Sequence, residues 1–302
     1  MTVSDLQKST IVRVRTSATR TLFRTAEVLA PWLGARVATD RWFRIPVKSL
    51  DPTVPADGTP FEVTSQRHVV RGTTWGDGPV VYLMHGWGGR GSQLAAYVDP
   101  LVRAGHRVVM FDAPSHGDSD PGPSGAGYSH GPQFGHALDA VASKYGPAKA
   151  VIAHSMGAVP ALMTLKYGWL GAERLVFLAP MARLSTQFDV FQRFLGFGPR
   201  TRRRMERYTE ELVGFSVGEF DVVDLASRMD PYPTLIVHDR GDRQTSYAES
   251  LDLAARLPDA ELITTDGLGH HRILRDTVVV RQVLAFVENA AQETDVAFGR
   301  PA

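Results

Sequence analysis

The most informative absence in this sequence is cysteine, which does not occur once in 302 residues. Its absence excludes disulfides, thiolate metal sites and cysteine nucleophiles, and it is compatible with the cytoplasmic location that we expect. Charge of one sign is also scarce, because 33 basic residues stand against 32 acidic ones and the net charge is +1. This balance gives no case for nucleic acid as a partner. No apolar run reaches the length of a membrane span.

The residues that are present suit one large globular domain. Hydrophobic residues make up 43% of the chain and charged residues 22%, so a sizeable core is expected. Only the first 50 residues are skewed, with nine basic residues against three acidic ones. There, Leu22, Ala26, Leu29 and Leu33 recur at helical spacing and predict an amphipathic helix that ends in a turn at Gly34. We expect this helix to pack on the domain surface with its arginines in solvent, and contact with a membrane or a protein partner is the alternative.

Short apolar runs alternate with helical stretches along most of the chain. Two runs of alternating polarity predict an antiparallel hairpin, and the later, continuously apolar runs predict strands buried on both faces. The pattern therefore predicts an α/β fold with a mostly parallel sheet and helices on both sides. Strands are expected at 61–64, 68–73, 79–84, 107–111, 150–153, 174–178, 234–238 and 261–264, and helices at 92–103, 133–145, 158–167, 247–257 and 273–291.

One interval interrupts this alternation. Residues 181–232 contain no clear strand but show helical patterns around 188–195 and 202–212. Because the interval joins two sheet strands, we expect a small helical cap over their carboxyl ends. Five arginines in this interval are expected to lie in solvent: Arg200, Arg202, Arg203, Arg204 and Arg207. The predicted organisation is an N-terminal helix and connector in 1–60, a core in 61–180 and 233–302, and the cap in 181–232.

The strongest chemical signal lies around Ser155. An apolar strand ends just before this serine, and a helical run follows it. A serine on a sharp strand-to-helix turn is pushed out of the fold and requires small residues two positions before and after it. Ala153 and Gly157 meet that requirement. A serine that caps a helix N-terminus is the simpler alternative, so the decision depends on the rest of the chain.

Polar residues at the carboxyl ends of other strands supply the partners that such a serine needs. A serine nucleophile requires a base that accepts its proton and a carboxylate that orients the base. Asp242 and His270 follow Ser155 along the chain, each after a separate strand. The carboxyl ends of parallel strands meet at one edge of a sheet, so these three side chains are expected to converge.

Five motifs in order make the chain resemble the serine α/β-hydrolases over roughly residues 60–295. They are the oxyanion loop His85-Gly86-Trp87-Gly88, the post-strand segment 112–119, the elbow Ala153-His154-Ser155-Met156-Gly157, the acid segment 237–242 and the base motif Gly269-His270. The resemblance implies the α/β-hydrolase fold with an eight-stranded sheet and a small cap. It also implies a catalytic triad of Ser155, Asp242 and His270. Ala153, Ser115 and Asp239 stand where the family usually has glycine.

For two of the triad residues, a nearby residue of the same type could take the role instead. Asp239 lies nearer its strand end than Asp242, but the longer loop to Asp242 favours the latter, because the carboxylate must swing across to the histidine. His271 competes with His270, and the preceding glycine favours His270. Some relatives place the acid after the earlier strand, but residues 178–181 contain no carboxylate.

Other residues receive supporting roles. The backbone N–H groups of Trp87 and Met156 are the expected oxyanion donors. His85 is expected to hold its loop by hydrogen bonds, and Asp112 and His116 to fix the loop that follows their strand. The candidates for the substrate pocket are Trp87, His154, Met156, Phe188 and Phe191. No group of residues has convincing metal-ligand spacing, so we expect neither a metal nor a cofactor.

The sequence thus predicts a serine hydrolase that cleaves a small-molecule carboxylic ester through an acyl-enzyme. Alternatives with the same triad are cleavage of a thioester, an amide or N-terminal proline peptide, a lactone or a carbon–carbon bond. A non-catalytic binding protein with a hydrolase-like fold is the alternative from another class, although such proteins usually lose part of the triad.

Overall fold

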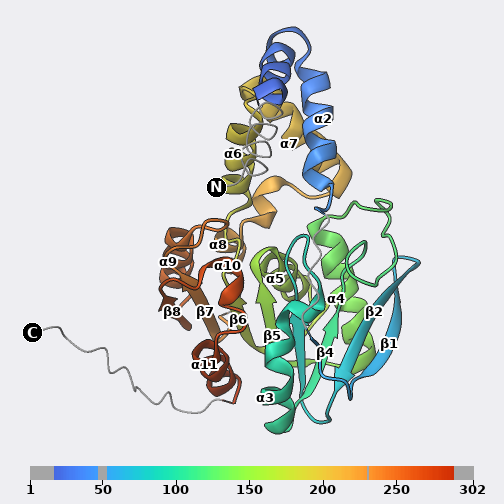
Figure 1. Ribbon diagram of the computed structural model, residues 1–302, viewed down its shortest axis with the longest axis vertical. Helices are drawn as coiled ribbons and strands as arrows, with labels where there is room; N and C mark the ends of the chain where they lie inside the picture. The colour runs from blue at the N-terminus through green and yellow to red at the C-terminus, as the bar shows by residue number, and fades with distance from the viewer. Residues whose placement is uncertain (1–16, 47–52, 230, 289–302) are drawn as a thin grey trace, which may run out of the picture.

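Eight strands form a single sheet in the order β1-β2-β4-β3-β5-β6-β7-β8. The computed structural model describes residues 17–46, 53–229 and 231–288. The β1–β2 and β2–β4 pairs are antiparallel and all other pairs are parallel, which confirms the predicted fold class (Figure 1). The strands are β1 (Thr59–Ser65), β2 (His68–Trp75), β3 (Val80–Met84), β4 (Arg107–Phe111), β5 (Ala148–His154), β6 (Ala172–Leu178), β7 (Thr234–Asp239) and β8 (Ala260–Thr265).

Helices cover both faces of the sheet. One face packs on α4 (Gly131–Tyr145), α5 (Ala158–Lys166), α8 (Val222–Ala226) and α9 (Tyr247–Arg256). The other face packs on the 3-10 helix η1 (Gly91–Tyr97), α3 (Val98–Arg103) and α11 (Thr277–Val287). Strand β3 is buried throughout, and its residues alternate between the two cores: Tyr82 and Met84 face the first, Val81 and Leu83 the second. This double burial explains why the central strands are continuously apolar.

The last predicted helix starts later in the structure than at residue 273. Residues Gly269–Arg272 form the short helix α10, and α11 begins only at Thr277. The Asp276 carboxylate accepts hydrogen bonds from the amides of Val278 and Val279, so it caps the first turn of α11 and sets its start. The helix is therefore present, but its expected start at residue 273 is wrong by four residues, and its predicted end at residue 291 lies outside the described residues.

A helical lobe rises from one end of the sheet (Figure 1). It consists of residues 17–46 together with α6 (Leu184–Leu195) and α7 (Pro199–Val213), which lie between β6 and β7. Residues 17–29 are helical, and helix α2 (Pro31–Phe43) follows after Ala30 and packs against α7. The 3-10 helix η3 (Val217–Phe220) and α8 lead from the lobe back to the core.

Two expectations for the N-terminal region are wrong. The helix does not turn at Gly34, which lies inside α2, where a Cβ would meet Thr201 Oγ1 at 3.2 Å. The break falls one turn earlier, because Pro31 begins a new helix as its first residue. The predicted apolar face is also not the buried one: Leu22 and Leu29 are 71% and 77% exposed, whereas Phe23 is buried.

No helix among the described residues combines the length and the apolar character that crossing a membrane requires.

Candidate active site

Ser155 stands on a tight turn between β5 and α5. Its φ of +55° is an unfavourable backbone conformation for a residue with a side chain, and Ser155–Gly157 form a 3-10 turn that leads into α5. Both flanks of the turn are crowded. A Cβ on Gly157 would lie 2.7 Å from the carbonyl oxygen of His85, and a Cβ on Gly86 would lie 2.8 Å from Cβ of Ser155. Steric contact therefore explains the small residues around this serine.

The structure brings Ser155, His270 and Asp242 into a continuous chain of contacts. Oγ of Ser155 lies 3.1 Å from Nε2 of His270, and Nδ1 of His270 lies 2.7 Å from Oδ2 of Asp242. The three residues follow β5, β8 and β7, so the parallel strands place them at one edge of the sheet. In this arrangement, His270 can accept the serine proton through Nε2 while Nδ1–H donates to the carboxylate.

The carboxylate of Asp242 is buried and collects several hydrogen bonds. The Gln244 amide donates to it over 2.7 Å, and the Thr245 hydroxyl donates over 3.0 Å. Burial by itself would raise the pKa of Asp242, but hydrogen bonds from His238, His270 and the Gln244 amide hold that pKa far below its usual range. Asp242 therefore stays ionised and can orient the ring of His270.

The neighbouring candidates have other contacts. Asp239 accepts hydrogen bonds from the amides of Gly241 and Leu268, over 2.9 and 2.8 Å, and fixes the loop instead of reaching the histidine. Nε2 of His271 lies 3.1 Å from the side-chain nitrogen of Gln244. The geometry thus places Asp242 and His270, and not Asp239 or His271, in line with Ser155.

A second histidine contacts Asp242, and the sequence analysis missed it. His238 is fully buried near the end of β7, with Nε2 3.4 Å from Oδ2 of Asp242 and Nδ1 2.6 Å from Oγ of Ser250. The one indication in the sequence was a histidine at the end of an otherwise apolar strand, four residues before Asp242. This indication did not identify Asp242 as the partner of His238, because the contact forms only when the loop after β7 folds back over the strand.

His154 is buried directly before the serine. Its Nε2–H donates to the backbone carbonyl of His270 over 3.1 Å, which ties the turn at Ser155 to the loop that carries His270. Burial lowers the pKa of His154 well below its ordinary value, and the neighbouring histidines lower it further. His154 is therefore neutral and holds a loop, although it also borders the cavity described below.

Two buried histidines shape the loop that carries Trp87. Nε2 of His85 accepts the amide of Ala113 over 2.9 Å, so its Nδ1–H donates to the carbonyl of Gly86. Nε2 of His116 accepts the amide of Gly88 over 3.2 Å. Burial lowers the pKa of His85 to about 4 and that of His116 to about 3, so both rings are neutral and able to accept these amides.

Asp112 completes the support of this loop, because its carboxylate accepts the amide of Gly91 over 2.6 Å. The backbone amide of Trp87 donates to no acceptor within the described part of the chain, and its loop passes beside Ser155. Met156 follows the serine at the start of the turn into α5. Amides at such a turn are suited to bind developing negative charge.

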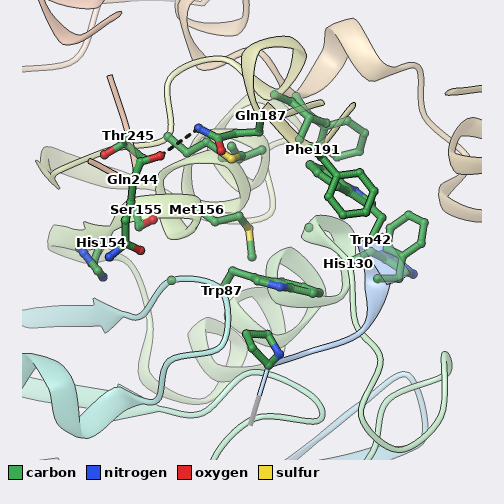
Figure 2. Close-up of a pocket in the computed structure, with 18 of the residues that line it drawn as sticks. Trp42, Trp87, His130, His154, Ser155, Met156, Gln187, Phe191, Gln244 and Thr245 are labelled. Atoms are coloured by element: carbon green, nitrogen blue, oxygen red, sulfur yellow. Dashed lines mark hydrogen bonds between the residues drawn. The ribbon is translucent and has the colours of Figure 1, made fainter. Parts of the chain in front are cut away.

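A cavity of about 430 Å³ opens onto Ser155. Figure 2 shows Trp87 and Met156 between the serine and an aromatic group formed by Trp42 and Phe191. The wall is mostly apolar and includes side chains from α2, the core and the cap. These apolar lining residues are Trp42, Phe43, Pro46, Trp87, Met156, Val159, Met181, Leu184, Phe191, Val213 and Phe220.

One pocket expectation requires correction, and one contribution was missed. Phe188 does not line the cavity, because it is fully buried and its ring stacks on Trp42 with a centroid distance of 4.4 Å. Trp42 faces the cavity in its place and also meets Phe191 edge-on at 5.1 Å. That α2 reaches the site was not predictable, since helical periodicity identifies a buried face of a helix but not the element that covers it.

Polar side chains also line the cavity, among them Arg41 and Arg44 at the end of α2, His130 and Gln187. Nδ1 of His130 is buried without a hydrogen-bond partner among the described residues, and burial lowers the pKa of His130 to about 4. Gln187 of α6 donates to the backbone carbonyl of Gln244 over 3.3 Å, which links the cap to the loop of Asp242 (Figure 2). Within the described ranges, no three histidine or acidic side chains are grouped to hold a metal ion.

Comparison with known proteins agrees with this architecture. The model of the alpha/beta hydrolase family matches residues 80–282. A search of curated protein sequences finds no match. Similar solved structures include a meta-cleavage product hydrolase from Pseudomonas fluorescens, with 16% identity, a TM-score of 0.58, and coverage of 76% of this chain and 98% of the other.

Two esterases are similar to the same degree. The Exiguobacterium antarcticum esterase has 15% identity and a TM-score of 0.57, with 75% of this chain and 98% of the esterase covered. The Thermogutta terrifontis esterase has 17% identity and a TM-score of 0.58, with 76% and 98% covered. At such identities the likeness concerns the fold alone, so the reaction has to be argued from the site.

Proposed function

The chain belongs to the alpha/beta hydrolase family, and we propose that it is a serine hydrolase that cleaves carboxylic esters through an acyl-enzyme intermediate. The observation that carries this proposal is the chain of contacts from Ser155 through His270 to Asp242, with the serine facing an apolar cavity. This arrangement supplies a nucleophile, a base and an orienting carboxylate without any other reactant besides water.

In the proposed reaction, Oγ of Ser155 attacks the ester carbonyl while Nε2 of His270 takes the hydroxyl proton. The carbonyl oxygen becomes an oxyanion, which the backbone amides of Trp87 and Met156 stabilise. His270 then gives the proton to the leaving alcohol as the C–O bond breaks. In the second half, His270 takes a proton from water, the resulting hydroxide attacks the acyl carbon, and Ser155 recovers its proton from His270 as the acid leaves.

The cavity favours an ester with an apolar acyl or alcohol portion. Trp87, Met156, Trp42 and Phe191 line the cavity from the serine outward, and removal of an apolar chain from water is worth roughly 0.8 kcal/mol for each CH₂ group. A volume of about 430 Å³ accommodates a small-molecule substrate. We therefore expect esters of medium-length or aromatic acids to be cleaved faster than acetates.

A substrate panel tests the proposal. The unaltered protein and Ser155→Ala are each assayed with p-nitrophenyl esters of increasing acyl length. The same two proteins are assayed with a thioester, a lactone, an aminoacyl amide and a diketone whose cleavage would break a carbon–carbon bond. We expect ester cleavage to dominate and kcat to fall by about 10⁴–10⁶ in Ser155→Ala. Ser143→Ala, at an exposed serine of α4, is the matched control and should retain full activity. Faster turnover of another bond, or near-normal esterase activity in folded Ser155→Ala, would contradict the proposal.

A further inference from the structure

The turn between residues 17–29 and α2 carries an unusual concentration of exposed apolar side chains. Four of them fall within six residues and are each about half exposed or more: Val28 at 70%, Leu29 at 77%, Trp32 at 49% and Leu33 at 48%. Their closeness in sequence keeps them together, because only Ala30 separates the two helices. We call these four residues the apolar corner.

Two further side chains extend the apolar corner along the helices. Leu22 lies two helical turns before Leu29 on the same face and is 71% exposed. Val37 lies one turn after Leu33 and is 39% exposed. Single exposed apolar residues are common on soluble proteins, but six within sixteen residues form a patch that calls for a partner.

Positive charge lies beside the apolar corner on α7. Pro31, the residue between Leu29 and Trp32 that begins α2, shares a surface hollow with the arginines of α7, namely Arg200, Arg203, Arg204 and Arg207. Glu206 and Glu210 also line the hollow, but Glu206 is paired with Arg202. Within the described part of the chain, none of the four arginines takes part in an ion pair.

The charge of the lobe contrasts with that of the whole chain. Residues 17–46 and 184–213 together contain eleven arginines and six acidic residues, a net charge of +5, although the complete chain has a net charge of +1. The positive charge is thus concentrated in the one lobe that also exposes the apolar corner. Apolar side chains flanked by arginines are complementary to the interface of an anionic bilayer, where hydrocarbon lies beneath phosphate groups.

The position of the apolar corner suits a flat membrane surface. Figure 1 shows the turn that joins residues 17–29 to α2 at the end of the lobe farthest from the sheet. The patch therefore projects from the molecule and is not recessed in a groove. A projecting corner can enter a fluid interface without a shaped receptor, whereas a protein partner would need a matching concave surface.

We propose that the apolar corner and the α7 arginines dock the protein on the surface of an anionic lipid bilayer. Leu29, Trp32 and their neighbours insert at the level of the headgroups, and the arginines bind lipid phosphate groups. This proposal does not depend on the proposed esterase activity. It does place the lobe that contributes Trp42 to the cavity beside a source of acyl lipids.

Vesicle sedimentation with the complete protein tests the proposal. We expect binding to vesicles of phosphatidylcholine and phosphatidylglycerol, at least about tenfold weaker binding to phosphatidylcholine alone, and a loss of affinity with added salt. The double substitution Leu29→Ser with Trp32→Ser should weaken binding to the anionic vesicles by about tenfold or more. Arg203→Gln with Arg207→Gln should weaken it as well and reduce the dependence on salt.

Matched controls lie on the core domain. Leu251 and Val278 are 47% and 49% exposed on α9 and α11, and Leu251→Ser with Val278→Ser should leave vesicle binding unchanged. Circular dichroism and an unchanged thermal unfolding transition show that each variant is folded. Failure to bind anionic vesicles, or equal binding by the Leu29/Trp32 variant, would overturn the proposal. A dimer that this variant dissociates, without vesicle binding, would identify the apolar corner as a contact between two copies and would also overturn it.

Discussion

At the scale of single residues, Asp242 is held by more partners than an orienting carboxylate needs. Besides His270, it contacts the Thr245 hydroxyl, the Gln244 amide and the buried ring of His238. These contacts explain how a carboxylate remains ionised away from water, since an unpartnered buried charge would be strongly disfavoured. His238 differs from the other partners because it reaches the carboxylate from the strand and not from the loop.

We predict that His238→Phe lowers kcat by about three- to tenfold, because the loop of Asp242 loses one fixed partner. The effect is modest since the 3.4 Å contact is a weak hydrogen bond, worth about 1 kcal/mol. His238→Gln, which keeps a donor, should recover part of the loss. If the melting temperature falls while kcat stays unchanged in His238→Phe, or if His238→Gln recovers none of the loss in kcat, His238 serves only to fill the core.

The glycine after Ser155 was predictable from the sequence, because a strand-to-helix turn of this kind is crowded by its neighbours. In the structure the crowding comes from the carbonyl oxygen of His85, on the loop after the adjacent strand. The choice of Asp242 over Asp239 also followed from local geometry, namely the reach of a loop. The contact of His238 with Asp242 was not predictable, because it depends on how residues 240–245 fold back over the strand.

At the scale of elements, α2 forms part of the wall of the cavity beside Ser155. Trp42 stacks on Phe188 of α6 and presents its other side to the cavity, so an N-terminal helix and the cap together form one wall. The strands were predictable to within two residues, since apolar runs are a local property. The element on which α2 packs was not predictable, because the same helical periodicity suits packing on a sheet, on a cap helix or on a membrane.

We predict that Trp42→Ala lowers kcat/KM for an octanoate ester by about tenfold and leaves an acetate ester nearly unchanged. The indole supplies apolar contact only to a chain that extends toward α2, and the lost contact corresponds to about 1.4 kcal/mol. Trp32→Ala is the matched control on the same helix, because Trp32 is half exposed and lies outside the cavity lining. An equal loss for both esters would show that Trp42 acts through folding of the cap.

Glu27 joins the first helix to α7. Its carboxylate accepts the backbone amides of Gly198, Arg200 and Thr201 over 3.1, 2.9 and 3.0 Å, and so it caps α7 from another helix. Partial burial raises the pKa of Glu27, but the hydrogen bonds outweigh this effect and lower it below the ordinary value. The stabilisation is therefore complete above the pKa of an unfolded glutamate, about 4.5, and is lost as the pH falls through the folded pKa.

We predict that Glu27→Ala weakens this cap by about 1 kcal/mol at neutral pH, as loss of a helix N-cap does. Hydrogen–deuterium exchange of the amides in residues 198–201 should accelerate by about fivefold, and the difference from the unaltered protein should vanish in acid. Glu211→Ala, at an exposed position of α7, is the control without a cap. Unchanged exchange in residues 198–201 would show that α7 is held by packing alone.

At the scale of the whole molecule, a nearly neutral chain is divided into two parts of unlike charge. The complete chain has a net charge of +1 and the lobe has a net charge of +5, so the remainder of the chain has a net charge of −4. Composition summed over the chain hides this division, although the basic first 50 residues already made membrane contact an alternative. The contribution of α7 was not predictable, because α2 and α7 are far apart in the sequence and lie side by side only in the fold (Figure 1).

The fold of the whole molecule and the family match establish the architecture but not the reaction. The sheet order and the match over residues 80–282 establish the hydrolase architecture, which many reactions share. The proposed reaction requires in addition that Ser155 is a nucleophile activated by His270. This requirement concerns the reactivity of one hydroxyl group, and it can be tested without knowledge of the substrate.

The most direct measurement is covalent labelling by a fluorophosphonate, followed by mass spectrometry of the peptides. We predict one adduct for each chain, located on Ser155, with labelling abolished in Ser155→Ala and slowed by at least about a thousandfold in His270→Ala. The exposed Ser143→Ala variant should label like the unaltered protein. An adduct on another serine, or no adduct on a folded protein with Ser155 intact, would contradict the account.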